Sequence, residues 1–187
     1  KFPKAGQNAL CRARVGILCL TPDKANMAMW GIYATDSNGQ GNMGFAVGFN
    51  TSAAFFNRKL TPDDALRHLR PVSYPENPPN LFFSDYMEES IPEQRVLFDI
   101  LYIKDKEWEA EKEWRMAITV PEDSASKAFG LENIPIDAIK EVLLGARADS
   151  ALENAASAFC KQHNIPFYRM KTTVDRILRP EPIILSK

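Results

Sequence analysis

The 187-residue sequence predicts one α+β domain over residues 1–187, with a mixed or antiparallel sheet and flanking helices. Three observations predict this class. The chain is 45% hydrophobic and 25% charged, close to the globular average, so a core can form without disulfides or metals. Short apolar runs typical of strands lie among segments with a helical period. Their alternation is irregular, which favours α+β over a doubly wound parallel sheet.

Short runs rich in branched and aromatic residues predict the strands. Val15–Leu20 is apolar, is too short for a helix, and is stopped by Thr21 and Pro22. Phe45–Phe49 alternates bulky with small residues, as a strand with one packed face does. The remaining predicted strands are Val72–Tyr74, Trp114–Val120, Lys140–Leu144, Phe167–Met170 and Ile177–Leu185. Two prolines place the last of these at a sheet edge.

Helical spacing of apolar residues predicts the helices. The predicted helices are one that starts at Pro22 and includes Asn26–Tyr33, then Thr61–Leu69, Pro92–Tyr102 and the Ala-rich Asp149–His163, which Asp149 or Ser150 caps. For the first of them, Thr21 followed by Pro22 is the expected N-cap and first helical residue. Met29, Ile32 and Tyr33 fall on its apolar face.

Charge and cysteine usage narrow the class of partner and the compartment. The net charge is −1 and no basic run occurs, so the charge does not indicate a polyanionic or polycationic partner. Nucleic acid stays a possible partner, because a local basic patch can form on a neutral protein. The chain has three widely spaced cysteines, Cys11, Cys19 and Cys160. An odd number at this spacing argues against a set of disulfides as the basis of the fold, which favours a reducing, cytoplasmic location. No apolar run is long enough to span a bilayer and no signal peptide is visible, so no membrane partner is expected.

Two familiar binding patterns are weak in this sequence. Residues 39–44 fit G-x-G-x-x-G, but they follow a predicted helix and precede a predicted strand, the reverse of a dinucleotide-binding loop. We therefore expect a flexible turn and mobile connector there. His68 and His163 stand alone and no C-x-x-C occurs, so no metal is expected.

The acidic segment of residues 104–115 is the most informative part of the chain. Its acidic residues occupy every second position: Asp105, Glu107, Glu109, Glu111 and Glu113. On a strand, Glu111 and Glu113 would share one face, where like charges repel and raise each other's pKa. One interpretation is a solvated charged stretch. The other is a carboxylate pair for a sugar, in which one group holds a ribose hydroxyl and stabilises developing positive charge while the other orients an acceptor.

Three tryptophans accompany these polar segments. Trp30 and Trp114 are expected to pack in the core, whereas Trp108, inside the charged run, is expected to be a lid or a stacking residue.

Several motifs together resemble a bacterial family known as domain of unknown function 2971. The resemblance rests on VGILCLT at Val15–Thr21, on MAMWGIYA through GFAVGF at Met27–Phe49, and on WEAEKEWRMAI at Trp108–Ile118, with IDAIKEVLLG at Ile136–Gly145 in the last family position. W-x-x-E-x-E-W-R is its most specific element. The family's usual His before the Tyr is Ile32 here, and its N-terminal tyrosine-rich strand and N-D-P segment are not recognisable.

A more distant similarity is to ADP-ribosyltransferases, which carry an early Arg or His strand, a middle Ser/Thr strand and a late E-x-E. This similarity implies an ADP-ribosyltransferase-like fold, with NAD as substrate and Glu113 and Glu111 as catalytic residues. It implies Arg14 (or Arg12), Thr21, Tyr33 and Trp108 as NAD-binding residues. It further implies a bacterial toxin or phage-defence effector that transfers ADP-ribose to an unknown protein or nucleic-acid acceptor. The alternatives are a non-catalytic binding or regulatory module, or another small-substrate or nucleic-acid enzyme.

Overall fold

The computed structural model describes residues 14–57, 67–77, 101–120, 133–175 and 177–185. Backbone contacts divide the chain into two compact units. Unit 1 comprises Lys1–Pro22 and Lys59–Glu132, and unit 2 comprises Asp23–Arg58 and Asn133–Lys187. The described part contains one antiparallel sheet, one mixed sheet and several helices, which confirms the α+β class. A single domain over residues 1–187 stays a prediction beside this division.

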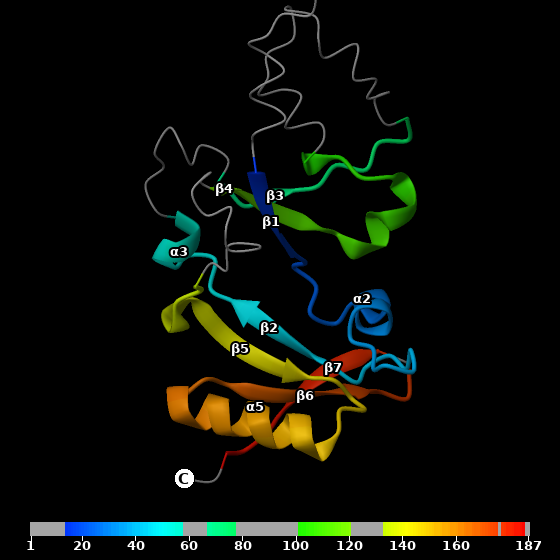
Figure 1. Cartoon of the computed structure of the whole chain (residues 1–187). Coiled ribbons are helices and arrows are strands. Elements are labelled where there is room, and N and C mark those ends of the chain that lie inside the picture. The colour runs from blue at the N-terminus through cyan, green and yellow to red at the C-terminus, as the bar shows by residue number, and fades with distance from the viewer. Residues whose placement is uncertain (1–13, 58–66, 78–100, 121–132, 176, 186–187) are drawn as a thin grey trace, which may run out of the picture. The chain divides into compact units, whose positions relative to one another are not determined.

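Unit 1 is built on a three-stranded sheet in the order β1-β4-β3 (Figure 1). Its strands are β1 (Arg14–Leu20), β3 (Arg70–Pro71) and β4 (Trp114–Val120), and the 3-10 helix η3 (Lys106–Glu111) precedes β4. β1 and β4 pair antiparallel along their whole length, with Cys19 opposite Arg115. The prediction of a strand at Val72–Tyr74 is wrong. The ladder with β4 ends at Pro71, and Ser73 forms an isolated bridge with Ile103 instead.

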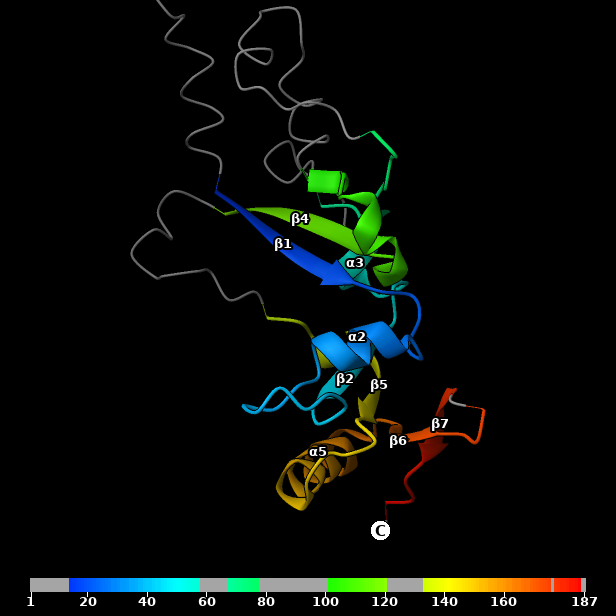
Figure 2. The same cartoon turned by 90° about the vertical axis from the view of Figure 1, so that its right-hand side faces the viewer.

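Unit 2 is built on a four-stranded sheet in the order β2-β5-β6-β7. The strands are β2 (Phe45–Phe49), β5 (Ile139–Leu144), β6 (Phe167–Thr172) and β7 (Leu178–Pro182). β5 and β6 are parallel, because α5 (Ser150–His163) carries the chain back between them, and the other pairs are antiparallel. β7 is an edge strand, as its prolines predict. Figures 1 and 2 show α5 lying along β5 and β6.

Two apolar clusters pack on opposite faces of this second sheet, since neighbouring β5 residues point to opposite sides. One cluster packs α5 against the sheet and contains Val142, Leu144, Cys160, Ile165 and Phe167. The other joins α2 (Met27–Ile32) to the sheet and contains Trp30, Ala34, Leu143, Met170 and Leu178. Trp30 is 5% exposed, and its indole Nε1 donates to the Lys24 carbonyl at 2.8 Å. The core position predicted for Trp30 is confirmed.

Helix α2 begins later than predicted. Its N-cap is Asn26, whose side chain accepts from the backbone N–H groups of Ala28 and Met29, so Thr21 is not the cap. The apolar face predicted for this helix is also wrong, since Ile32 and Tyr33 are exposed and Trp30 is the buried residue of the helix. A six-residue helix has too few turns to bury a full stripe.

The other predicted helices fare differently. α5 and its cap are confirmed, because Asp149 accepts from the N–H of Leu152. Of the predicted helix Thr61–Leu69, residues 67–69 are not helical and the remainder lies outside the described residues. Of Pro92–Tyr102, Leu101 and Tyr102 are helical and the rest is likewise outside. The short elements α3 (Ala54–Asn57) and η5 (Ile136–Ala138) complete unit 2. In the described part of the chain, no helix is long and apolar enough to cross a membrane.

Candidate functional site

The backbone of Glu113 is fixed on both sides at the start of β4. Helix η3 ends at Lys112, which takes the left-handed conformation with φ 49° and ψ 45° and turns the chain into the strand. The N–H of Glu113 donates to the Tyr74 hydroxyl at 2.8 Å, and its carbonyl accepts from Val72 N at 2.9 Å. A left-handed non-glycine residue costs free energy and persists only where its surroundings determine it. The backbone at Glu113 is therefore strongly constrained.

The carboxylate of Glu113 is held by the arginine two residues further along β4. Arg115 Nε donates to Oε1 at 2.7 Å and Nη2 donates to Oε2 at 3.0 Å, the bidentate geometry that a guanidinium offers a carboxylate. Arg115 Nη1 donates to the Leu101 carbonyl at 2.7 Å, which anchors the guanidinium itself. Glu113 is only 6% exposed, so its charge is neutralised inside the protein rather than by water.

Lys104 joins the two glutamates of the E-x-E pair. Its ammonium donates to Glu111 Oε2 and, at 3.2 Å, to Glu113 Oε2. The same ammonium stands 4.9 Å from the centre of the Trp108 ring, within cation–π distance. Glu111 is 4% exposed and Lys104 is partly buried, so one cation serves two nearly buried carboxylates.

These contacts set the protonation state of Glu113. Burial alone would raise the pKa of its carboxyl, but the hydrogen bonds from Arg115, Cys19 and Lys104 outweigh burial and lower it from 4.5 to about 2. The expectation that the paired carboxylates raise each other's pKa is thus wrong for Glu113. The cationic side chains of Arg115 and Lys104 lie next to Glu113, and they lower its pKa where a neighbouring carboxylate would raise it.

Cys19 completes the group of side chains from the neighbouring strand. It lies opposite Arg115 on β1, and its thiol hydrogen-bonds to the Glu113 carboxylate. Shielding from water, followed by the contact with Glu113, raises the pKa of Cys19 to about 11. Although the residue is exposed, its thiol stays protonated at neutral pH and acts as a donor.

The sequence-predicted site residues are only partly brought together. Trp108 lies beside Lys104 and is 43% exposed, which suits a stacking residue. The last residue pair of the β1–β4 ladder is Leu20 with Trp114. Thr21 follows Leu20 and Glu113 precedes Trp114, so these two residues are adjacent to the same end of the ladder. Arg14 pairs with Val120 at the far end of β1, so its backbone lies about 20 Å along the strand from Leu20.

Two further tryptophan and tyrosine predictions have different outcomes. Tyr33 belongs to unit 2, where it is the C-cap of α2 and is 61% exposed. Trp114 is 36% exposed, so the core position predicted for it is wrong. Residues alternate across a strand, and Trp114 lies on the face of β4 opposite the one that carries Glu113 and Arg115.

Sequence reasoning missed four residues of the cluster: Cys19, Tyr74, Lys104 and Arg115. A signal existed for Arg115, because residues two apart in a strand share a face and W-x-x-E-x-E-W-R places it two after Glu113. Cys19 required the β1–β4 register. Tyr74 and Lys104 approach Glu113 through loop and turn geometry, for which the sequence gives no periodic signal.

The glycine-rich loop of residues 39–44 is held by hydrogen bonds within the chain. Gly39 N donates to the Asp36 carbonyl, Asn42 N to Trp30, and the N–H groups of Met43 and Gly44 to Ala34. The loop carbonyls in turn accept from Gly145 and Arg147. Amides used in this way already have acceptors within the chain, and β2 follows the loop as predicted. The expectation of a mobile connector does not fit so many fixed contacts.

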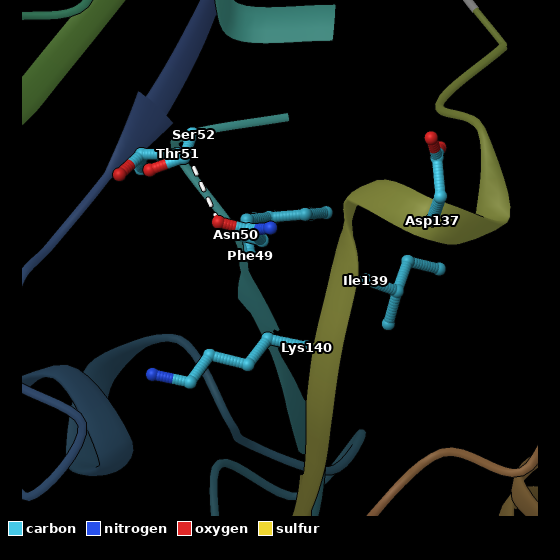
Figure 3. Close-up of a pocket in the computed structure, with 7 residues that line it drawn as sticks. All are labelled: Phe49, Asn50, Thr51, Ser52, Asp137, Ile139 and Lys140. Carbon is cyan, nitrogen blue, oxygen red and sulfur yellow. Dashed lines mark hydrogen bonds between the residues drawn. The ribbon is translucent and has the colours of Figure 1, made fainter. Parts of the chain in front are cut away.

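A separate open pocket of about 540 Å³ lies in unit 2, where β2 ends and β5 begins (Figure 3). Its lining residues are Phe49, Asn50, Thr51, Ser52, Asp137, Ile139 and Lys140. Figure 3 shows Asp137 and Lys140 extending in different directions, so its charged groups do not converge on one position. None of the predicted site residues lines it. Within the described ranges, no group of three or more His, Cys, Asp or Glu side chains is placed to hold a metal ion.

Comparison with known proteins gives one match. Residues 29–116, slightly under half of the chain, match the model of a family described as a protein of unknown function (DUF2971). This match supports the resemblance that the motifs indicate, and it includes both Trp30 and the W-x-x-E-x-E-W-R block. No curated protein and no solved structure is similar enough to match this chain.

Proposed function

We propose that the cluster around Glu113 transfers ADP-ribose from NAD to an acceptor. The observation that carries the proposal is the fixed, ionised carboxylate of Glu113, held by Arg115 and almost excluded from water. Preorganised charge in a dry site stabilises a transition state more than the same charge in water. The late E-x-E that resembles ADP-ribosyltransferases supplies the reaction class.

We assign the following roles to the side chains of this proposed site. Glu113 accepts a ribose hydroxyl and stabilises positive charge at the anomeric carbon. The bond from that carbon to nicotinamide breaks, nicotinamide leaves with the electron pair, and an acceptor nucleophile bonds to the carbon and loses its proton to water. Trp108 has an exposed ring for stacking on a base, and Thr21 lies next beyond the β1–β4 pair. The acceptor is a protein or nucleic acid, and the biological setting is a bacterial toxin or phage-defence effector.

The direct test is nicotinamide release from NAD by the purified protein with a cell lysate as the source of acceptor. Glu113→Gln keeps the shape of the side chain and should lower the rate by about 100-fold or more. Glu109→Gln is the matched control, because Glu109 lies in the same segment but is exposed, and its carboxylate pairs with Lys106. Full activity of Glu113→Gln would remove Glu113 from the mechanism.

A second candidate is a non-catalytic binding module, favoured by a specific observation. Glu111 and Glu113 are 4% and 6% exposed and already have cationic partners within the chain, as in a structural ion-pair network. In that case the protein releases no nicotinamide, and Glu113→Gln lowers its unfolding temperature without altering any activity. Both measurements on the same preparation separate the two candidates.

A further inference from the structure

The carboxylate of Glu113 has no acceptor position left for a ligand. An ionised carboxylate offers about four lone-pair positions. Arg115 occupies two of them, at 2.7 and 3.0 Å, and Lys104 a third at 3.2 Å. The Cys19 thiol provides the fourth donor. A hydroxyl group can therefore bond to Glu113 only after one of these donors withdraws.

Arg115 is the donor least able to withdraw. It is bidentate on Glu113, and its third hydrogen bond anchors it to the Leu101 carbonyl. Moving it would leave the partly buried guanidinium without its carboxylate and would remove two donors from the nearly buried Glu113, which is costly. Cys19 is a weak donor, and its position is fixed by the β1–β4 ladder.

Lys104 differs from both in having a second carboxylate within reach. Its bond to Glu113, at 3.2 Å, is longer than the two bonds from Arg115, and its ammonium already donates to Glu111. A lysine stem is flexible and its ammonium has three donors, so it can turn without a change in backbone. The centre of the Trp108 ring is 4.9 Å from the ammonium and stabilises its charge where it stands beside Glu111 and Glu113.

We propose that, when a ribose hydroxyl binds, the Lys104 ammonium gives up its hydrogen bond to Glu113 and keeps the one to Glu111, which frees an acceptor position on Glu113. We call this change the hand-over of Lys104. Glu111 is then a positioning residue whose role is to hold the lysine away from the reacting group. This gives a role to the contact of Lys104 with both carboxylates, although Glu113 already has Arg115 as its partner. The inference rests on the proposed function for the identity of the ligand, but the hand-over itself concerns residues of this chain alone.

Binding of NAD to four proteins tests the hand-over: wild type, Lys104→Met, Glu111→Gln and the double variant. In Glu111→Gln the ammonium of Lys104 loses its second carboxylate and stays bonded to Glu113, where it blocks the ribose hydroxyl. NAD binding should therefore weaken by about tenfold, a difference of about 1.4 kcal/mol. In the Lys104→Met background the same change should have no effect, because no lysine remains to block Glu113. Equal effects of Glu111→Gln in both backgrounds would overturn the hand-over.

Matched controls come from the neighbouring ion pair. Lys106 Nζ contacts Glu109 Oε2 at 3.0 Å in the same helix η3, but both side chains are exposed. Lys106→Met and Glu109→Gln should each leave NAD affinity unchanged. A change as large as that of Glu111→Gln would assign the effect to the charge of the segment instead, and would count against the hand-over.

A second experiment needs no NAD and so separates this inference from the proposed function. In Glu113→Gln, Lys104 should remain bonded to Glu111, and lysine-selective ¹⁵N NMR should still show its ammonium protected from exchange. Loss of that protected signal in the folded variant would show that Glu111 alone does not hold the lysine, and the hand-over would fall. If the signal persists while wild type neither binds NAD nor releases nicotinamide, the proposed function fails and NAD is not the ligand, whereas the ability of Glu111 alone to hold Lys104 is supported.

Discussion

Glu113 immediately precedes β4 and Arg115 is the second residue of that strand, and their side chains meet through two hydrogen bonds of 2.7 and 3.0 Å. Residues two apart on a strand share a face, so the backbone conformation itself brings the carboxylate and the guanidinium together. The pair therefore depends on β4 being extended from its first residue. The left-handed Lys112 allows this, because it ends helix η3 immediately before Glu113.

The first prediction concerns acid stability. The folded protein lowers the pKa of Glu113 from 4.5 to about 2, so this group stabilises the fold above pH 4.5 and the contribution is lost as the pH falls through 2. We expect wild type to lose about 3 kcal/mol more unfolding free energy over this range than Glu113→Gln. Urea unfolding of both proteins at several pH values measures this; parallel pH dependences would contradict it.

The second prediction concerns the shape of the Arg115 side chain. Arg115→Lys keeps the charge but cannot reproduce the bidentate contact together with the bond to the Leu101 carbonyl. A loss of about 2 kcal/mol in unfolding free energy is expected. Arg147→Lys is the control, since Arg147 is exposed and its side chain donates to Gln40 at 2.7 Å. That change should cost less than about 0.5 kcal/mol.

The third prediction concerns the reactivity of Cys19. Its pKa is raised from 9.0 to about 11, so the thiolate fraction at pH 8 falls by about 100-fold relative to an ordinary thiol. Cys19 should therefore alkylate slowly although it is exposed, and Glu113→Gln should accelerate the reaction. Iodoacetamide labelling followed by peptide mass spectrometry reads Cys19 separately from the other cysteines. A rate equal to that of a free thiol would show that the contact with Glu113 is absent.

The fourth prediction concerns a close contact in unit 2. A Cβ at Gly145 would meet the Asn42 carbonyl and lie 2.8 Å from the Gly44 carbonyl oxygen, both of them backbone. Gly145→Ala should cost about 1–3 kcal/mol, because backbone atoms cannot move aside cheaply. Gly31→Ala in helix α2 should have the opposite sign, about 1 kcal/mol of stabilisation, since a Cβ there meets nothing within 4 Å. Thermal unfolding compares the two.

The fifth prediction separates the tryptophans. Trp30→Ala removes a ring that is 5% exposed and its hydrogen bond to Lys24, and it should cost about 3–5 kcal/mol. Trp108→Ala removes a 43% exposed ring and one cation–π contact, and it should cost about 1 kcal/mol or less. Similar losses of unfolding free energy for the two variants would contradict this assignment.

The strands with regular patterns could be predicted from the sequence, whereas short elements could not. Trp114–Val120 has the predicted bounds, and Lys140–Leu144 and Asp149–His163 are each within one residue. β3 has two residues, too few for a period, and its position depends on pairing with β4. The cap of α2 was missed because Thr21 and Asn26 are both good caps, and only the fold decides which precedes the helix.

The sequence could predict where the candidate site lies, but it could not predict which charged groups surround the two glutamates. Alternation of glutamates drew attention to Glu111 and Glu113, and both are buried at the start of β4. Their counter-ions determine the chemistry, and Lys104 reaches them across the turns of η3. The spacing of Glu113 and Arg115 indicates one counter-ion, but a side chain such as Lys104 that arrives through irregular backbone leaves no spacing rule in the sequence. The balance between burial and hydrogen bonds that sets the pKa of Glu113 therefore required the structure.

The division into two units has a practical consequence for dissecting the chain. Each unit is made of two separate segments, and the polypeptide passes between the units after Pro22, Arg58 and Glu132. A truncation after Glu132 would remove β5, the strand that pairs with β2, and would leave the first half of unit 2 with an unpaired edge. Neither unit can be expressed as a continuous fragment. Isolating unit 1 requires excising residues 23–58 and bridging the gap with a linker.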